Sequence, residues 1–166
     1  MKKSIGFLFV IALLYSSCEQ QSNNMSDPTL SINSDRACKQ WTFKAGAQPG
    51  PDQSCIRWSY DDNGTLTITH INAGFNCCPE KLLASFEIND NNIYITEDDS
   101  LAGCHCNCLY DLEMVLQDLA PVNYILHISE PLVADSSEQF RIELDLKHHT
   151  QGEFFIDRAF YPWGNQ

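Results

Sequence analysis

The sequence predicts an all-β protein, a single antiparallel β-sandwich of seven or eight strands. Three observations support this. Apolar and polar residues alternate repeatedly between Ile56 and Phe160, turn-forming residues separate the alternating runs, and no run has the 3.6-residue spacing of an amphipathic helix. Because side chains alternate between the two faces of a strand, each run buries one face against a partner sheet. Several short strands separated by turns are typical of a sandwich.

The first half of the folded region is predicted to contain two hairpins. Residues 56–60 and 66–70 alternate on either side of a turn at 61–64 that ends in Asn-Gly. Residues 82–88 alternate up to a turn rich in Asn and Asp, after which the segment from Ile93 begins the return strand. The acidic run at 97–99 then reads as a solvated loop.

The second half begins with a long strand that contains three cysteines. If residues 104–116 are extended, one face carries Cys104, Cys106, Cys108, Tyr110, Leu112, Met114 and Leu116. A turn near Pro121 and a strand at 124–128 follow, an arrangement that resembles immunoglobulin-like sandwiches and implies that topology. Residues 140–146 alternate cleanly, and 154–160 are expected to close the sheet.

Residues 1–17 have the features of a secretory signal peptide. Two lysines precede an apolar run that ends near Tyr15 and is too short to span a bilayer as a helix. The segment that ends in Ser16, Ser17 and Cys18 resembles the lipobox of bacterial lipoproteins, in which small residues precede a lipidated cysteine. The alternative is an ordinary signal peptide, with Cys18 free to form a disulfide.

The lipobox resemblance implies a cell-envelope lipoprotein, held through lipid on Cys18 at the outer rather than the inner membrane of a Gram-negative cell. The chain is similar to cysteine-rich envelope lipoproteins of bacteria, and that similarity carries no activity with it. Residues 18–35 are polar and predict a flexible tether, which leaves 36–166 as the sandwich domain. A formal net charge of −12 disfavours nucleic acid as a partner. A protein or glycan partner is left open.

The number of cysteines is informative because it is odd in the mature chain. Of eight cysteines, seven remain once Cys18 carries lipid, so one thiol has no partner within the monomer. Residues two apart on a strand have Cα atoms about 6.5 to 7 Å apart, at the limit for a disulfide, so the three cysteines of 104–108 should not pair with one another. Cys77 and Cys78 could serve two of them if the chain kinks. Cys38 and Cys55 are the other candidate pair.

The remaining thiols predict a site for a thiophilic metal, Zn²⁺ or Cu⁺. Its candidate ligands are Cys77, Cys78, Cys104, Cys106, Cys108 and His70. An exported chain also permits the simpler interpretation, a binding or scaffold module stapled by disulfides without metal. A thiol redox protein is the third hypothesis, and His70 is equally compatible with a place in the core.

Enzyme signatures are not found in the sequence. It contains no H-E-x-x-H, G-x-S-x-G, P-loop or G-x-G-x-x-G motif. We therefore interpret the chain as a lipid-anchored envelope protein, non-enzymatic, with a cysteine cluster that binds metal or forms disulfides.

Overall fold

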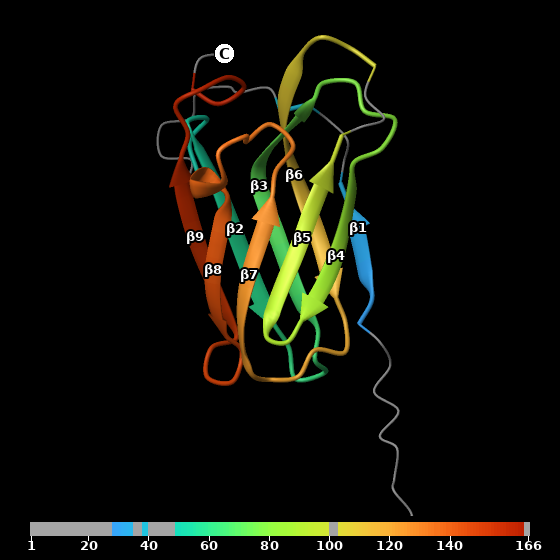
Figure 1. Ribbon diagram of the computed structural model, residues 1–166, viewed down its shortest axis with the longest axis vertical. Helices are drawn as coiled ribbons and strands as arrows, with labels where there is room; N and C mark the ends of the chain where they lie inside the picture. The colour runs from blue at the N-terminus through green and yellow to red at the C-terminus, as the bar shows by residue number, and fades with distance from the viewer. Residues whose placement is uncertain (1–27, 35–37, 40–48, 100–102, 165–166) are drawn as a thin grey trace, which may run out of the picture.

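The computed structural model describes residues 28–34, 38–39, 49–99 and 103–164, and it confirms the all-β sandwich. The five-stranded sheet has the order β1-β6-β3-β2-β9, and the four-stranded sheet has the order β4-β5-β7-β8 (Figure 1). The elements are β1 (Leu30–Asn33), β2 (Gln53–Tyr60), β3 (Leu66–Asn76), β4 (Leu83–Asn89), β5 (Asn92–Asp98), β6 (Asn107–Leu116), β7 (Asn123–Ser129), η1 (Ser136–Glu138), β8 (Phe140–Asp145) and β9 (Gln151–Asp157). The predicted leader, Cys18 and most of the tether lie outside the described residues.

Both predicted hairpins are confirmed, and local turn chemistry explains them. Strands β2 and β3 pair antiparallel across a turn in which Asp61 Oδ1 accepts hydrogen bonds from the backbone N–H groups of Asn63 and Thr65, each at 2.9 Å. Gly64 closes that turn with a φ of 81°, which favours glycine. Strands β4 and β5 pair across a turn in which Asp90 has a φ of 53°. Asp tolerates this left-handed conformation better than most residues.

The described part contains nine strands, one more than the upper prediction. The additional strand is β1, which lies within the segment predicted as a tether. Its residues Leu30 and Ile32 are half-buried against the core, and the strand pairs with the far end of β6. Alternation over only four residues is too short to distinguish such an edge strand from polar linker.

Two features of the topology differ from the expectation. Strands β5 and β7 pair in parallel, so the sandwich is antiparallel only in its other pairings. Strands β6 and β7 belong to different sheets, as do β8 and β9. The immunoglobulin-like topology is not confirmed. Strands that follow one another in the sequence lie in different sheets at these points, and the alternation of apolar residues does not reveal which sheet a strand joins.

The main core lies between the sheets and is formed by the inward residues of both. Its buried members include Ile56, Trp58, Leu66, Ile68, Ile93, Ile95, Met114, Leu116, Leu126, Ile128, Phe140, Ile142 and Leu144. A second buried cluster lies towards the start of β6 and comprises Ala73, Phe75, Leu82, Cys108, Tyr110 and Leu112. The inward face predicted for 108–116 is thus confirmed.

A β-bulge separates the two clusters on β3. The register with β6 shifts between Ile71 and Ala73, and the intervening Asn72 is buried with a φ of 62°. Before the bulge Ile68 and His70 face the interior, whereas after it Ala73 and Phe75 do. An extra residue in one strand reverses the alternation beyond it. The bulge therefore determines which face of the sheet the side chains occupy as the chain approaches Cys77.

The pairing of Gly152 with Trp58 generates a stability prediction. A Cβ at position 152 would lie 2.6 Å from Trp58 Nε1, and the indole is held in the core. Gly152→Ala should lower the free energy of unfolding by about 1 to 2 kcal/mol, because the indole must move. Urea denaturation measures this. Gly103→Ala is the control, since a Cβ at that position would have no atom within 4 Å. A Gly152→Ala variant as stable as the parent would contradict the packing.

Candidate functional site

The cysteine site lies where the β3–β6 ladder ends. Asn76 and Asn107 form the last register pair of the two strands. One residue beyond, the N–H of Cys77 still donates to the carbonyl oxygen of Cys106, at 2.9 Å. The ladder thus continues into the two loops and holds them side by side.

Three disulfides connect six cysteines at this end of the sandwich. Cys77 bonds to Cys106, Cys78 to Cys104 and Cys38 to Cys108, with Cα separations of 5.4, 6.0 and 5.7 Å. As predicted, no two of the cysteines at 104, 106 and 108 pair with each other. The vicinal pair at 77 and 78 serves two of them, which requires the bend that the chain makes there.

The predicted pairing of Cys38 with Cys55 is wrong. Cys38 bonds to Cys108, and Cys55 is a free, buried cysteine on β2. The sheet order explains the difference. The chain leaves β1 beside β6, and the N–H of Lys39 donates to the carbonyl oxygen of Leu109 at 2.9 Å. Strand β2 lies two positions from β6, or about 10 Å at the usual strand spacing, beyond disulfide reach.

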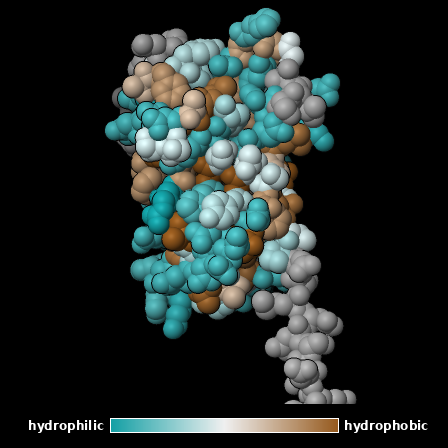
Figure 2. Space-filling view, viewed as in Figure 1, coloured by the Kyte–Doolittle hydropathy of each residue, from teal (hydrophilic) through white to brown (hydrophobic). Residues whose placement is uncertain are grey.

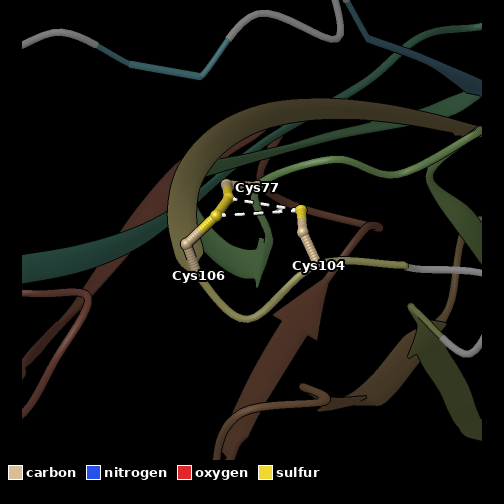
Figure 3. A group of neighbouring side chains, drawn as sticks. All are labelled: Cys77, Cys104 and Cys106. Atoms are coloured by element: carbon tan, nitrogen blue, oxygen red, sulfur yellow. Dashed lines mark hydrogen bonds between the residues drawn. A yellow bond between two sulfur atoms is a disulfide. The ribbon is translucent and has the colours of Figure 1, made fainter.

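Cys104 and Cys106 do not belong to the strand predicted over 104–116. Strand β6 begins at Asn107, and the preceding residues bend. The bend brings the Cys104 sulfur to 3.6 Å from that of Cys77 and 3.7 Å from that of Cys106 (Figure 3). The three sulfurs all lie within 4.8 Å of one another. In a straight strand the Cα atoms of Cys104 and Cys106 would lie about 7 Å apart, with both side chains on one face.

The side chain of Asn76 joins the two loops. Its Oδ1 accepts a hydrogen bond from the N–H of Cys78 at 3.1 Å and lies 3.1 Å from the Cys104 sulfur. Its Nδ2 donates to the carbonyl oxygen of Cys104 at 2.5 Å. One residue thus positions the backbone of both cysteine segments. Sequence reasoning missed it, although Asn directly before a Cys-Cys-Pro turn is a recognisable signal.

Two of the six predicted metal ligands are separated from the others. Cys108 lies within β6, in its own disulfide, and is nearly fully buried. His70 lies on β3 opposite Leu112, six residues before the strand ends. At about 3.3 Å per residue it is roughly 20 Å from the cysteine loops. The structure therefore brings together only Cys77, Cys78, Cys104 and Cys106.

His70 instead belongs to a buried polar network between the sheets. Its Nδ1 lies 2.6 Å from Glu97 Oε1, and its Nε2 lies 2.8 Å from Ser54 Oγ and 3.5 Å from Glu130 Oε1. Arg158 forms an ion pair with Glu130 and donates to the carbonyl oxygen of Glu138 at 2.6 Å. All five network residues, Ser54, His70, Glu97, Glu130 and Arg158, are at most 3% exposed.

The burial of Glu97 contradicts the solvated loop predicted for 97–99. Glu97 is part of β5 and continues the inward face of Ile93 and Ile95. The period-two pattern therefore contains the signal, but the charge of the side chain favours exposure when the segment is considered alone. Among the described residues, Glu97 Oε2, Glu130 Oε1 and Arg158 Nε are buried without a hydrogen-bond partner.

Burial and charge shift the titration of this network. Burial raises the pKa of Glu130 to about 7, against the opposing effect of His70 and Arg158. Burial alone would lower the pKa of His70, but the charge of Glu97, its hydrogen bond and the charge of Glu130 together raise it. Both groups therefore hold protons more tightly in the folded protein.

Ser54, His70 and Glu97 have the connectivity of a Ser–His–acid triad. The hydroxyl contacts one ring nitrogen and the carboxylate the other. Catalysis also needs the hydroxyl to meet substrate, and Ser54 is 0% exposed. We interpret the arrangement as a hydrogen-bond network within the core.

Comparison of the chain with family models, with curated proteins and with solved structures finds no match. Within the described ranges, no helix is long and apolar enough to cross a membrane.

The pairing predicts a specific thiol count. Purified Cys18→Ser protein, kept without reductant, should show one alkylatable thiol after denaturation, and peptide mapping should assign it to Cys55. In the native protein this thiol should react slowly, because burial raises the pKa of Cys55 and shields its sulfur. A Cys38–Cys55 bridge in the peptide map, or several free thiols, would contradict the pairing.

The buried network predicts a dependence of stability on pH. A folded pKa of Glu130 above its unfolded value adds stability at low pH that is lost as pH rises towards and through 7, and His70 acts in the same direction. Between pH 5 and 8 the Glu130 contribution should fall by roughly 2 to 3 kcal/mol. Glu130→Gln should remove that fall in urea denaturation. Exposed Glu87→Gln should leave it unchanged, and equal slopes in all three proteins would contradict the assignment.

Proposed function

We propose that the chain is a lipid-anchored protein of the bacterial cell envelope whose disulfide-stapled sandwich acts as a binding or scaffold module. The observation that carries the proposal is the set of three disulfides downstream of a lipobox-like leader. Of the functions that the sequence left open, this one needs no metal and no catalysis.

The disulfides support an exported location. They close loops with sequence separations of 70, 29 and 26 residues. By loop-closure entropy each would stabilise the fold by about 3 to 4 kcal/mol. Such bonds persist in oxidising compartments and are rare in the cytosol. The envelope location rests on this chemistry together with the leader.

The register of β1 gives the anchored protein an orientation. Leu30 pairs with Leu116 at the end of β6, whereas the cysteine loops precede the start of that strand (Figure 1). Ten residues of β6 span about 34 Å. A tether that joins Cys18 to β1 would therefore hold the opposite end of the sandwich nearest the membrane. The cysteine end would face away from the lipid.

The outer surface of the four-stranded sheet suits a binding role. In Figure 2 the face over β4, β5, β7 and β8 is a mosaic of hydrophilic and hydrophobic residues. Tyr94 is 42% exposed there and stacks on His127 with ring centroids 4.6 Å apart. Exposed aromatic rings beside polar groups fit a protein or glycan partner.

Lipidation at Cys18 is the test of the proposal. The parent protein should fractionate with membranes and carry the mass of a lipid, and Cys18→Ser should move it to the soluble fraction, because no other anchor is proposed. Cys55→Ser is the control and should remain in the membrane fraction. A Cys18→Ser protein that stays with membranes, or a parent without lipid, would refute the anchor.

A further inference from the structure

We propose that reduction converts the two neighbouring disulfides of Cys77, Cys78, Cys104 and Cys106 into a tetrathiolate site for one Zn²⁺ ion. The disulfide and the metal-bound forms are then two states of the same four sulfurs. The proposal does not depend on the lipid anchor.

The spacing of the sulfurs already suits zinc. A tetrahedron of thiolates at a Zn–S distance of about 2.3 Å has edges of about 3.8 Å. Two of those edges are present, since the Cys104 sulfur lies 3.6 Å from that of Cys77 and 3.7 Å from that of Cys106. The third edge, between Cys77 and Cys106, is a disulfide that lengthens once it is reduced (Figure 3). Cys78, adjacent in sequence and bonded to Cys104, supplies the fourth sulfur.

The backbone around the site does not need the two disulfides to stay in place. The β3–β6 ladder extends to Asn76 and Asn107, and the Cys77–Cys106 backbone hydrogen bond follows it. Asn76 bridges the loops through Cys78 N–H and the Cys104 carbonyl. Asn107, the first residue of β6, is held by Tyr161, whose Oη donates to the Asn107 carbonyl oxygen at 2.7 Å and accepts from the Asn107 N–H at 3.0 Å. These contacts pre-organise the thiols after reduction.

The sulfurs are also accessible to reagents. Cys78 and Cys106 are exposed, and Cys77 and Cys104 are half-buried, whereas Cys55 and Cys108 are buried. A reductant can therefore reach both bonds of the site, whereas the third bond joins an exposed Cys38 to a buried Cys108. Within the described ranges, Cys77, Cys104 and Cys106 form the one group of His, Cys, Asp or Glu side chains arranged closely enough to hold a metal, and Cys78 is linked to that group by its bond to Cys104.

The chemistry balances with a dithiol reductant. Two dithiol molecules each lose two electrons and two protons and become disulfides, while the Cys77–Cys106 and Cys78–Cys104 bonds break to give four thiols. Binding of Zn²⁺ then displaces the four thiol protons. Two molecules of a disulfide oxidant reverse the sequence, because each accepts two electrons and two protons and becomes two thiols, while the two protein bonds form again and the ion is released.

The test uses the Cys18→Ser chain, with and without a phosphine reductant, followed by Zn²⁺ and removal of free metal. The reduced protein should retain one Zn²⁺ per chain, the unreduced protein none, and addition of diamide should release the bound ion. Cys77→Ser and Cys106→Ser should each weaken zinc binding at least 10-fold, whereas Cys55→Ser should match the parent.

A positioning variant separates a built site from unfolded thiols that scavenge zinc. Asn76→Ala should weaken binding about 10-fold, as expected for a residue that orients ligands without being one. Exposed Asn123→Ala is its control and should not change affinity. Absence of stoichiometric zinc in the reduced protein, whether or not it remains folded, would overturn the proposal. Equal affinities in Asn76→Ala and the parent would overturn it as well.

Discussion

The β3–β6 pairing, with its bulge at Asn72, is the constraint on which most of this structure depends. Asn72 adopts a left-handed conformation that is costly for a non-glycine residue. Hydrogen bonds hold it there: its Nδ2 donates to the carbonyl oxygens of Gly50 and Gln53, and its own carbonyl accepts from Trp163 Nε1 at 2.8 Å. Because the bulge reverses the alternation, one strand presents His70 to the main core and Phe75 to the cluster beneath the cysteines. A slip of one residue would turn Cys77 away from Cys106.

The two chemically distinctive regions of the protein both involve β3, since His70 lies on the strand and Cys77 follows its last residue, and they differ in exposure. Around His70, charged groups are enclosed, and burial without full hydrogen bonding makes such a network costly unless its members neutralise one another. The contacts of Glu130 with Arg158 and of Glu97 with His70 provide that neutralisation. Around Cys77 the cysteines are half-buried or exposed. The first region contributes to the specificity of the core, and the second is where chemistry is possible.

The cysteine end of the sandwich, where the β3–β6 ladder stops, is held together by disulfides and by contacts from both ends of the described chain. Cys38 follows β1 across a short segment and is bonded to the start of β6, so the chain that follows β1 is fixed to the central ladder. From the other terminus, Trp163 packs on Leu109, and Tyr161 bonds to Asn107. Segments that precede the first long strand and follow the last one thus both contact the start of β6. Closure of this kind stabilises the fold, and the proposed anchor would point this end away from the membrane.

By itself the sequence determined the local features. Alternation and turn chemistry are properties of neighbouring residues, and they located the two hairpins, the inward face of 108–116 and the all-β class. The spacing of Cys104, Cys106 and Cys108 likewise excluded pairing among the three. Tertiary structure decided the rest: that Cys38 reaches Cys108 rather than Cys55, that His70 lies away from the sulfurs, that Glu97 is buried, and that β7 pairs in parallel with β5. Each of these depends on which distant strands become neighbours. That choice follows from the packing of two whole sheets and from a bulge without a strong local signature, so no window of sequence contains it.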